Sequence, residues 1–287
     1  MIYFYKYQGA GNDFIMINNM DKSISLNGVE IKRLCDRHFG IGADGVIFLE
    51  SSDTADCFMN YYNSDGTIAQ MCGNGARCTA AFFLEQTLSS KMELLIDTRA
   101  GIKKVKCNVD GSFSVNMGKP VFVHEDFPFH VTTSSTCGGM VNFSFYGYEL
   151  YCVSMGNPHA VTIVDDLNEI DIKAMGPKIE NDYHFPNKIN VEFVEKISDD
   201  YYKVAVWERG CGVTLACGTG ACAVFVVLNK ISSRQGSSHN SPRPCLGRKN
   251  NKEITLEFPG GKLFLYENNE GHIILRGSAT FVFKGGI

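Results

Sequence analysis

The feature that most constrains this chain is a motif that occurs twice, Cys-Gly-x-Gly-Ala, first within MCGNGARC and again within LACGTGACA. Its cysteines, Cys72 and Cys217, are 145 positions apart (217 − 72 = 145) in a chain of 287 residues. A Gly-Asn motif repeats at the same spacing, at Asn12 and Asn157 (157 − 12 = 145). Two independent motifs with one common spacing predict a duplicated fold, in which each half is one structural repeat.

The local pattern is the same in both halves. Short segments rich in β-branched and aromatic residues, bounded by turn residues, predict strands. Helices are expected at 74–86 and 219–228, directly after the repeated motif, and both are apolar nearly all round, as is typical of enclosed helices. A further helix is expected at 29–38, between a capping Asn27 and Gly40. We therefore expect an α+β protein of two pseudo-symmetric domains, each a β-barrel-like strand layer around a central helix, with the active site in the interdomain cleft.

The domain boundaries follow from the repeat. The N-terminal half is expected to span 1–118 and to be completed by a C-terminal strand at about 277–287. The C-terminal half is expected to span 119–276. Within it, 232–251 is rich in Ser, Asn, Arg, Pro and Gly and cannot bury an apolar face, so that it is expected to be a flexible insertion.

Charge and cysteine content limit the possible partners. The net charge of −4, without a block of basic residues, argues against binding to nucleic acid or to an anionic membrane. The first residues lack the features of a secretory signal, and no apolar run is long enough to span a bilayer. Eleven cysteines without a C-x-x-C pair favour neither a disulfide framework nor a zinc site. We expect a cytoplasmic protein without a bound metal, whose partners are a small-molecule substrate and further copies of itself.

The repeated motif also predicts chemistry. A glycine-rich turn that leads into a helix presents unpaired backbone N–H groups, and glycine allows a ligand to approach them. Two such turns could hold one carboxylate between them. The residues that would supply the N–H groups are Gly73, Asn74, Gly218 and Thr219. A helix N-terminus lowers the pKa of a cysteine, so that Cys72 and Cys217 are candidate acid–base groups.

Two cysteines on equivalent elements suggest proton transfer at a carbon stereocentre, with one sulfur on each face. That reaction is racemisation or epimerisation, and no cofactor is expected if the negative charge spreads into a carboxylate held by two helix dipoles. A competing interpretation is a pair of buried structural cysteines, which most free cysteines are. The segment GTGACA also fits a dinucleotide-binding fingerprint, but neither a ribose-binding acid nor a βαβ unit follows it.

At these motifs the chain resembles the diaminopimelate epimerases, cofactor-independent enzymes that interconvert LL- and meso-diaminopimelate in lysine and peptidoglycan biosynthesis. The resemblance runs end to end, through GAGNDF, NSDG, MCGNGARC, GNPH, NVEF and ERG…ACGTGACA. It implies a homodimer in which Cys72 and Cys217 are the catalytic bases, and in which His159 and Glu208 tune their pKa values. The residues that it implies for substrate binding are Asn12, Asn63, Gly73, Asn74, Asn157, Asn190, Glu208, Arg209, Gly218 and Thr219.

Three positions depart from the family pattern: Gly45, Val213 and Cys211, which is unusual in the loop before Cys217. Gly45 stands where many relatives carry Gln, and Val213 stands where Glu is common. The resemblance leaves open which of His159 and Glu208 supports which cysteine. It also leaves alternatives: racemisation of another amino acid such as histidine or proline, a thiol hydrolase that needs only one of the cysteines, and a binding module that needs neither.

Overall fold

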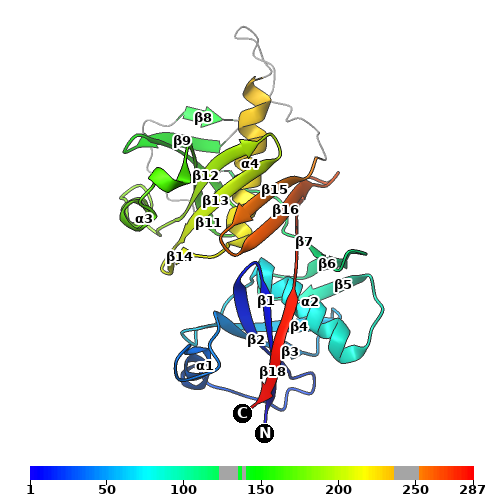
Figure 1. The fold of residues 1–287 in the computed structure, drawn as a ribbon. Coiled ribbons are helices and arrows are strands. Elements are labelled where there is room, and N and C mark those ends of the chain that lie inside the picture. The colour runs from blue at the N-terminus through cyan, green and yellow to red at the C-terminus, as the bar shows by residue number, and fades with distance from the viewer. Residues whose placement is uncertain (123–134, 138–139, 236–251) are drawn as a thin grey trace. The chain divides into compact units, whose positions relative to one another are not determined.

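The structure is a computed structural model that describes residues 1–122, 135–137, 140–235 and 252–287. The chain divides into two compact units (Figure 1). Unit 1 comprises Met1–Asn116 together with Arg276–Ile287, and unit 2 comprises Met117–Leu275. The end of the chain thus belongs with its beginning. Most of the predicted insertion, from 236 to 251, lies outside the described residues.

Unit 1 is a run of paired strands around one central helix. Its strands are β1 (Tyr3–Gly9), β2 (Asn12–Asn18), β3 (Gly45–Glu50), β4 (Cys57–Asn63), β5 (Glu93–Asp97), β6 (Lys103–Cys107), β7 (Phe113–Asn116) and β18 (Thr280–Gly286), and its helices are α1 (Gly28–Cys35) and α2 (Gly73–Thr87). The strands pair in the order β18-β1-β2-β3-β4-β5-β6-β7, with β2–β3 and β4–β5 parallel and the others antiparallel. Helix α2 contacts every strand from β1 to β7, so that it is enclosed by the layer.

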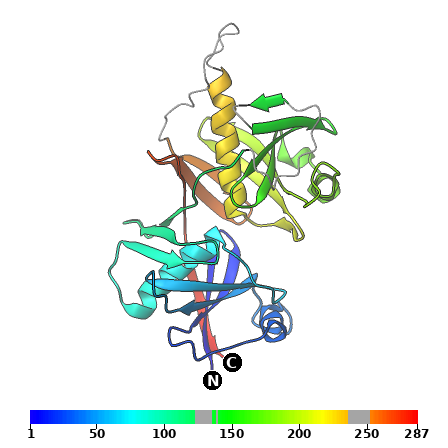
Figure 2. The same cartoon turned by 180° about the vertical axis from the view of Figure 1, so that it is seen from behind.

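Unit 2 has the same plan. Its strands are β8 (Ser135–Cys137), β9 (Met140–Phe145), β10 (Tyr148–Ser154), β11 (Pro158–Val164), β12 (Asn190–Ser198), β13 (Tyr201–Glu208), β14 (Gly212–Thr214), β15 (Ile254–Phe258) and β16 (Gly261–Glu267), and its helices are η1 (Leu167–Glu169), α3 (Ile172–Glu180) and α4 (Gly218–Gln235). Strand β17 (Ile273–Gly277) crosses the boundary along the chain. Helix α4, in yellow in Figure 2, contacts β10, β11, β12 and β16.

The two units share one strand register. In the parallel pair β2–β3, Phe14 lies opposite Gly45, and in the parallel pair β11–β12, His159 lies opposite Asn190. His159 and Asn190 are the positions 145 residues after Phe14 and Gly45, so the two pairs have the same register. Helices α2 and α4 each begin one residue after the repeated cysteine. The predicted duplication is confirmed, and each residue around one cysteine has a counterpart around the other.

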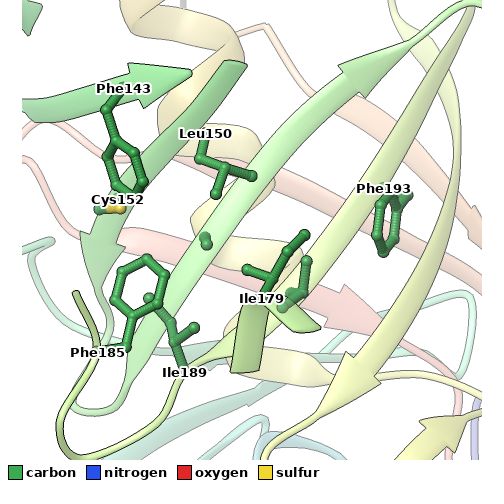
Figure 3. Close-up of a cluster of buried hydrophobic side chains, with 9 residues drawn as sticks. Phe143, Leu150, Cys152, Ile179, Phe185, Ile189 and Phe193 are labelled. Carbon is green, nitrogen blue, oxygen red and sulfur yellow. The ribbon is translucent and has the colours of Figure 1, made fainter. Parts of the chain in front are cut away.

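The central strands are covered on both faces. In β2, Ile15 and Ile17 belong to an apolar cluster that includes α1, whereas Phe14 lies against the first turn of α2. Unit 2 repeats this arrangement, since Phe193 of β12 belongs to the cluster with Ile179 of α3 shown in Figure 3. Burial on both faces explains why these strands are continuous apolar runs rather than alternating ones.

Two helices end several residues away from where the sequence predicts. Helix α1 ends at Cys35 instead of 38, because Asp36 is extended and its carboxylate accepts the N–H groups of His38 and Phe39. Helix α4 continues to Gln235 instead of 228, so that the first four residues of the predicted insertion are helical.

Helix α3 was absent from the sequence prediction. Its N-cap Asp171 accepts the N–H of Ala174, and Pro177 lies inside the helix, where proline ordinarily argues against one. Among the residues that the structure describes, no helix is both long and apolar enough to cross a membrane.

Candidate active site

Cys72 is the N-cap residue of α2, with an extended backbone at φ −139°. Its Sγ accepts a hydrogen bond from the N–H of Gly75 at 3.4 Å. The same sulfur donates to Oδ1 of Asn12 at 3.5 Å. The partly buried thiol is therefore held at the first turn of the helix, where it faces a side-chain amide.

Cys217 has the same position at the start of α4. Its Sγ accepts the N–H of Gly220 at 3.4 Å and lies 3.4 Å from Oγ1 of Thr219. The residue is 6% exposed. The contact between each cysteine and the glycine three residues later is thus repeated in both units, as the motif predicts.

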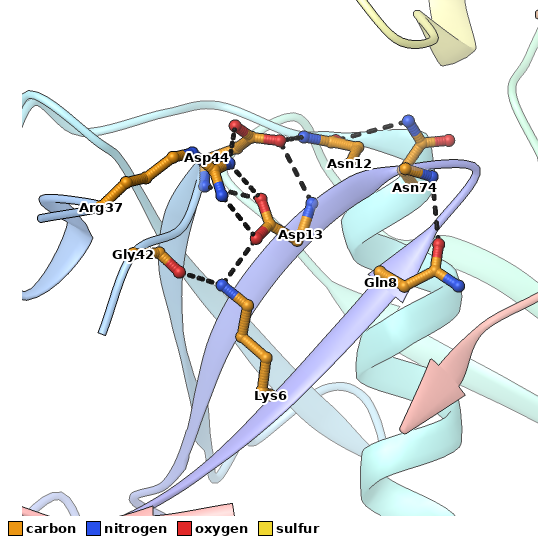
Figure 4. A network of polar contacts seen from close by, with 9 residues as sticks. Lys6, Gln8, Asn12, Asp13, Arg37, Gly42, Asp44 and Asn74 are labelled. Atoms are coloured by element: carbon orange, nitrogen blue, oxygen red, sulfur yellow. Dashed lines mark hydrogen bonds and ion pairs between the residues drawn. The ribbon is translucent and has the colours of Figure 1, made fainter. Parts of the chain in front are cut away.

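The orientation of Asn12 is set by a polar network (Figure 4). Its Nδ2 donates to Oδ2 of Asp44 at 2.7 Å, and its Oδ1 accepts from Nδ2 of Asn74 at 3.3 Å. Arg37 holds the other oxygen of Asp44 at 2.9 Å. Because a carboxylate only accepts hydrogen bonds, Asp44 turns the amide so that its oxygen faces Cys72.

A second carboxylate, Asp13, anchors this network. It lies 2.6 Å from Nζ of Lys6 and 2.7 Å from a guanidinium nitrogen of Arg37, and Lys6 also donates to the carbonyl of Gly42. Burial raises the pKa of Asp13, but the hydrogen bonds from Arg37 and Lys6 outweigh it and bring the pKa below its usual value. The network is therefore built on ionised groups.

Asn63 and Gly45 face each other where β4 ends and β3 begins. The Asn63 amide donates to Oγ1 of Thr67 at 3.0 Å, within its own turn, and not to the group around Asn12. A Cβ at position 45 would lie 2.5 Å from the carbonyl oxygen of Tyr62 and 2.6 Å from the ring of Tyr61. Packing in this chain therefore leaves no room for a side chain at Gly45.

His159 and Glu208 both lie in unit 2, the unit of Cys217. The His159 ring is wholly buried, with Nδ1 2.7 Å from Oε1 of Glu192 and Nε2 3.1 Å from Oδ1 of Asn157. Glu208 accepts the hydroxyl of Thr214 at 2.5 Å.

Electrostatics around Cys217 overturn one prediction. Burial raises the pKa of the Cys217 thiol well above its usual value, and the charges of Glu208 and Glu192 raise it further. Hydrogen bonds from Thr219 and the N–H of Gly220 offset only part of this rise. The expected lowering of the pKa by the helix N-terminus is therefore wrong for Cys217. Burial also raises the pKa of Glu208, with a contribution from Glu192.

Asn190 and Arg209 lie at the same edge of unit 2. Asn190 donates to the carbonyl of Pro158 at 2.8 Å and accepts the N–H of Arg209 at 2.9 Å. The exposed Arg209 side chain donates to the carbonyl of Asn187 at 3.0 Å. Since β11 and β12 begin at this edge and β13 ends there, the strand order brings Asn157, Asn190 and Arg209 together.

The duplication shows where the two cysteines differ. At the 145-residue spacing, residues of unit 1 that do not titrate near neutral pH correspond to titratable residues of unit 2. The pairs are Phe14 and His159, Ile47 and Glu192, and Asn63 and Glu208.

The sequence alone did not identify Glu192 and Asp44 as residues of the site. The signal for Glu192 was a carboxylate inside the apolar run of NVEFV, at the position where unit 1 has Ile47.

Two duplicated units, each with a cysteine at the first turn of an enclosed helix, define a two-cysteine racemase or epimerase architecture. The family model for diaminopimelate epimerase matches residues 4–123 and 151–282. The diaminopimelate epimerase of Gloeothece citriformis (strain PCC 7424) is 39% identical over 291 residues, covering 99% of this chain and 98% of the relative. The chain belongs to the diaminopimelate epimerase family.

Solved structures of other proteins share the fold. A phenazine biosynthesis protein of the PhzF family from Bacillus anthracis matches with a TM-score of 0.67 at 16% identity, over 99% of this chain and 98% of that one. A hydroxyproline epimerase from Agrobacterium vitis matches with a TM-score of 0.62 at 14% identity, over 99% and 91%. These likenesses establish the architecture.

Proposed function

We propose that this protein interconverts LL- and meso-diaminopimelate by moving a proton at one α-carbon. Membership of the family supports the substrate and the class of enzyme, an isomerase. The observation that carries the chemistry is the pair of cysteines, Cys72 and Cys217, each held by the N–H of the glycine three residues later at a helix N-terminus.

The proton balance uses one sulfur on each face of the α-carbon. One cysteine, as a thiolate, removes the α-proton and becomes a thiol, while the electron pair stays on the carbon. The other cysteine, as a thiol, gives its proton to the opposite face and becomes a thiolate. The raised pKa of Cys217 supports its role as the proton donor of the first turnover.

The negative charge that develops on the substrate needs stabilisation. We assign this to the first turns of α2 and α4, helices of 15 and 18 residues whose N-termini carry partial positive charge. The residues that would present N–H groups to the reacting carboxylate and amine are Gly73, Asn74, Gly218 and Thr219.

The far amino-acid centre of diaminopimelate needs partners of its own. Arg209 suits its carboxylate, because the guanidinium has further N–H groups beyond the one that bonds to Asn187. Side-chain amides that donate and accept would complete this part of the site, at Asn12, Asn63, Asn157 and Asn190. Glu208, which the family also places among the substrate-binding residues, lies beside Cys217.

The test incubates the reduced protein with LL-diaminopimelate in deuterium oxide and follows α-proton loss and meso-product formation by NMR. Exchange with epimerisation is expected in the parent and in Cys211→Ser, a control at an exposed cysteine of the same unit. Both Cys72→Ser and Cys217→Ser should lose epimerisation. Epimerisation that survives in either of these two variants would contradict the two-base mechanism.

Substrate choice is tested separately with proline and histidine in the same assay. We expect no exchange with either. Exchange with one of them, and none with diaminopimelate, would overturn the proposed substrate while it left the two-base chemistry in place.

We propose further that the protein is a cytoplasmic homodimer. The exposed apolar side chains of strand β18 support a protein interface there. Phe281, Val282 and Phe283 are 43%, 51% and 45% exposed. The strand pairs with β1 along one of its edges. Light scattering after size-exclusion chromatography should give the mass of a dimer for the parent and for Val109→Lys, a control in an exposed turn. Val282→Lys should give a monomer, and a dimer of unchanged stability would contradict this interface.

A further inference from the structure

Glu192 is a buried carboxylate that the proposed chemistry has not yet used. Its side chain has no exposed surface, and Oε1 lies 2.7 Å from Nδ1 of His159, which is equally buried. Within the described part of the chain, Oε2 has no hydrogen-bond partner. An incompletely paired carboxylate in the interior costs stability, so that its presence calls for a functional reason.

The carboxylate lies against the first turn of α4. A Cβ on Gly220 would be 2.5 Å from Oε1 of Glu192 and 3.2 Å from Cβ of Cys217. In unit 1, a Cβ on Gly75 would instead meet Cδ1 of Ile47 at 3.1 Å. The fold therefore accepts an apolar side chain at this position, and the charge in unit 2 is not needed for packing.

We propose that Glu192 is a positioning residue for the proton of Cys217: it holds the His159 ring through Nδ1 and keeps the Cys217 sulfur protonated until a substrate is bound. The inference deepens the proposed function, and it rests on that function for the role of Cys217 as a base.

The groups that act on Cys217, and the His159 ring that contacts Glu192, come from four elements. Glu192 is on β12, His159 is on β11, Glu208 is on β13, and Thr219 is on α4. The two carboxyl groups oppose ionisation of the thiol, whereas the Thr219 hydroxyl and the N–H of Gly220 favour it. Of the two carboxyl groups, Glu208 accepts the hydroxyl of Thr214, whereas Glu192 is the one in contact with His159.

The arrangement also explains how a thiolate can remove a weakly acidic α-proton. A thiol whose ionisation is opposed by its surroundings is a stronger base once it is ionised. In the return direction, when Cys217 takes up the α-proton, that basicity lowers the barrier. Glu192 thus acts on both directions of the reaction through one sulfur.

The experiment measures the protonation of Cys217 directly in the full-length protein. Cysteine labelled with 13C at Cβ reports ionisation by its NMR shift, and Cys217→Ser identifies the signal. The parent should show no Cys217 midpoint below pH 9.0, its usual value. Glu192→Gln should lower the midpoint by at least about one pH unit, which is the effect of removing one nearby charge.

Two further variants make the result decisive. Glu192→Ile introduces the residue of the equivalent position in unit 1 and serves if the glutamine variant does not fold. Glu195→Gln is the matched control, because this carboxylate on the same strand accepts the N–H of Leu167 and should leave the midpoint unchanged. A Cys217 midpoint that stays at the parent value in a folded Glu192 variant overturns the inference. A lowered midpoint in a protein that does not exchange the α-proton of diaminopimelate supports the role of Glu192 and refutes the proposed function.

Discussion

Asp44 should control the rate through Asn12, although it touches neither thiol. Its Oδ2 accepts from Nδ2 of Asn12 at 2.7 Å, and its Oδ1 lies 2.9 Å from Arg37. In Asp44→Asn, the new side chain has one acceptor and one donor group. If its oxygen turns to Asn12, its NH2 group opposes Arg37, and if it turns to Arg37, Asn12 loses its acceptor.

The magnitude follows from the bond that is lost. A hydrogen bond to a charged group contributes about 1.5–3 kcal/mol. The Asp44 side chain is 42% exposed, so that solvent reduces this contribution, and we expect about 1–2 kcal/mol. If the whole loss falls on the orientation of the Asn12 oxygen toward Cys72, kcat/KM decreases about five- to thirtyfold.

The assay compares kcat/KM for α-proton exchange with the thermal midpoint of unfolding. Asp21→Asn is the control, because this exposed carboxylate caps a turn at Ser23 away from Asn12, and it should leave kcat/KM unchanged. A folded Asp44→Asn variant with kcat/KM within about twofold of the parent would refute the reasoning, since about 0.4 kcal/mol is too little for a lost charged hydrogen bond.

Three further outcomes are expected. Gly220→Ala should reduce kcat far more than Gly75→Ala. The new methyl group would lie 2.5 Å from a buried carboxylate oxygen of Glu192 in the first variant, but 3.1 Å from the flexible end of Ile47 in the second. Equal losses of kcat in the two variants would contradict this prediction. Gly45→Ala should lower the free energy of unfolding by about 1–3 kcal/mol through overpacking, as measured by denaturant titration, and an unchanged stability would show that the strands can separate there. The pKa of Glu208 in the folded protein is raised above its unfolded value of 4.5. Protonated Glu208 therefore contributes its full stabilisation below pH 4.5, and this stabilisation is lost as the pH rises through the pKa of the folded state. Unfolding measured from pH 4 to 8 should therefore show a smaller loss of stability in Glu208→Gln than in the parent, and parallel curves would disprove the shift.

The sequence was sufficient where the signals are local. Cys72 and Cys217 were placed at helix N-termini, with the helix starts predicted one residue late, because a glycine-rich turn followed by an apolar helix is encoded within one segment. The common spacing of the motifs likewise predicted the repeated plan of the two units. Helix α3 escaped prediction because Pro177 contradicts local propensity, and Ile179, buried in the unit 2 core, provides tertiary packing that overrides it.

The properties that depend on distant residues were beyond the sequence. The lowered pKa expected for Cys217 considered only its helix, whereas its burial and the carboxyl groups of Glu208 and Glu192 come from neighbouring strands. Asp44 was missed for the same reason, because 32 positions separate it from Asn12 (44 − 12 = 32) and only the parallel pairing of β2 and β3 brings them together. Spacing within the chain predicts helix caps, but not which side chains meet across a sheet.

The place of β18 in unit 1 determines the order in which the protein can fold during synthesis. Met117–Leu275 contains all of unit 2, so that this unit is complete before Arg276–Ile287 has been made. Synthesis of that segment takes roughly 8–32 s at about 5–20 residues per second. Throughout that time, one edge of β1 lacks β18, the strand with which it later pairs. The side chains of Phe4 and Tyr7 on β1, which are buried in the finished protein, are then only partly covered. The unit that begins the chain is therefore the last to be finished, and until then the unpaired edge of β1 is a template on which another chain could pair.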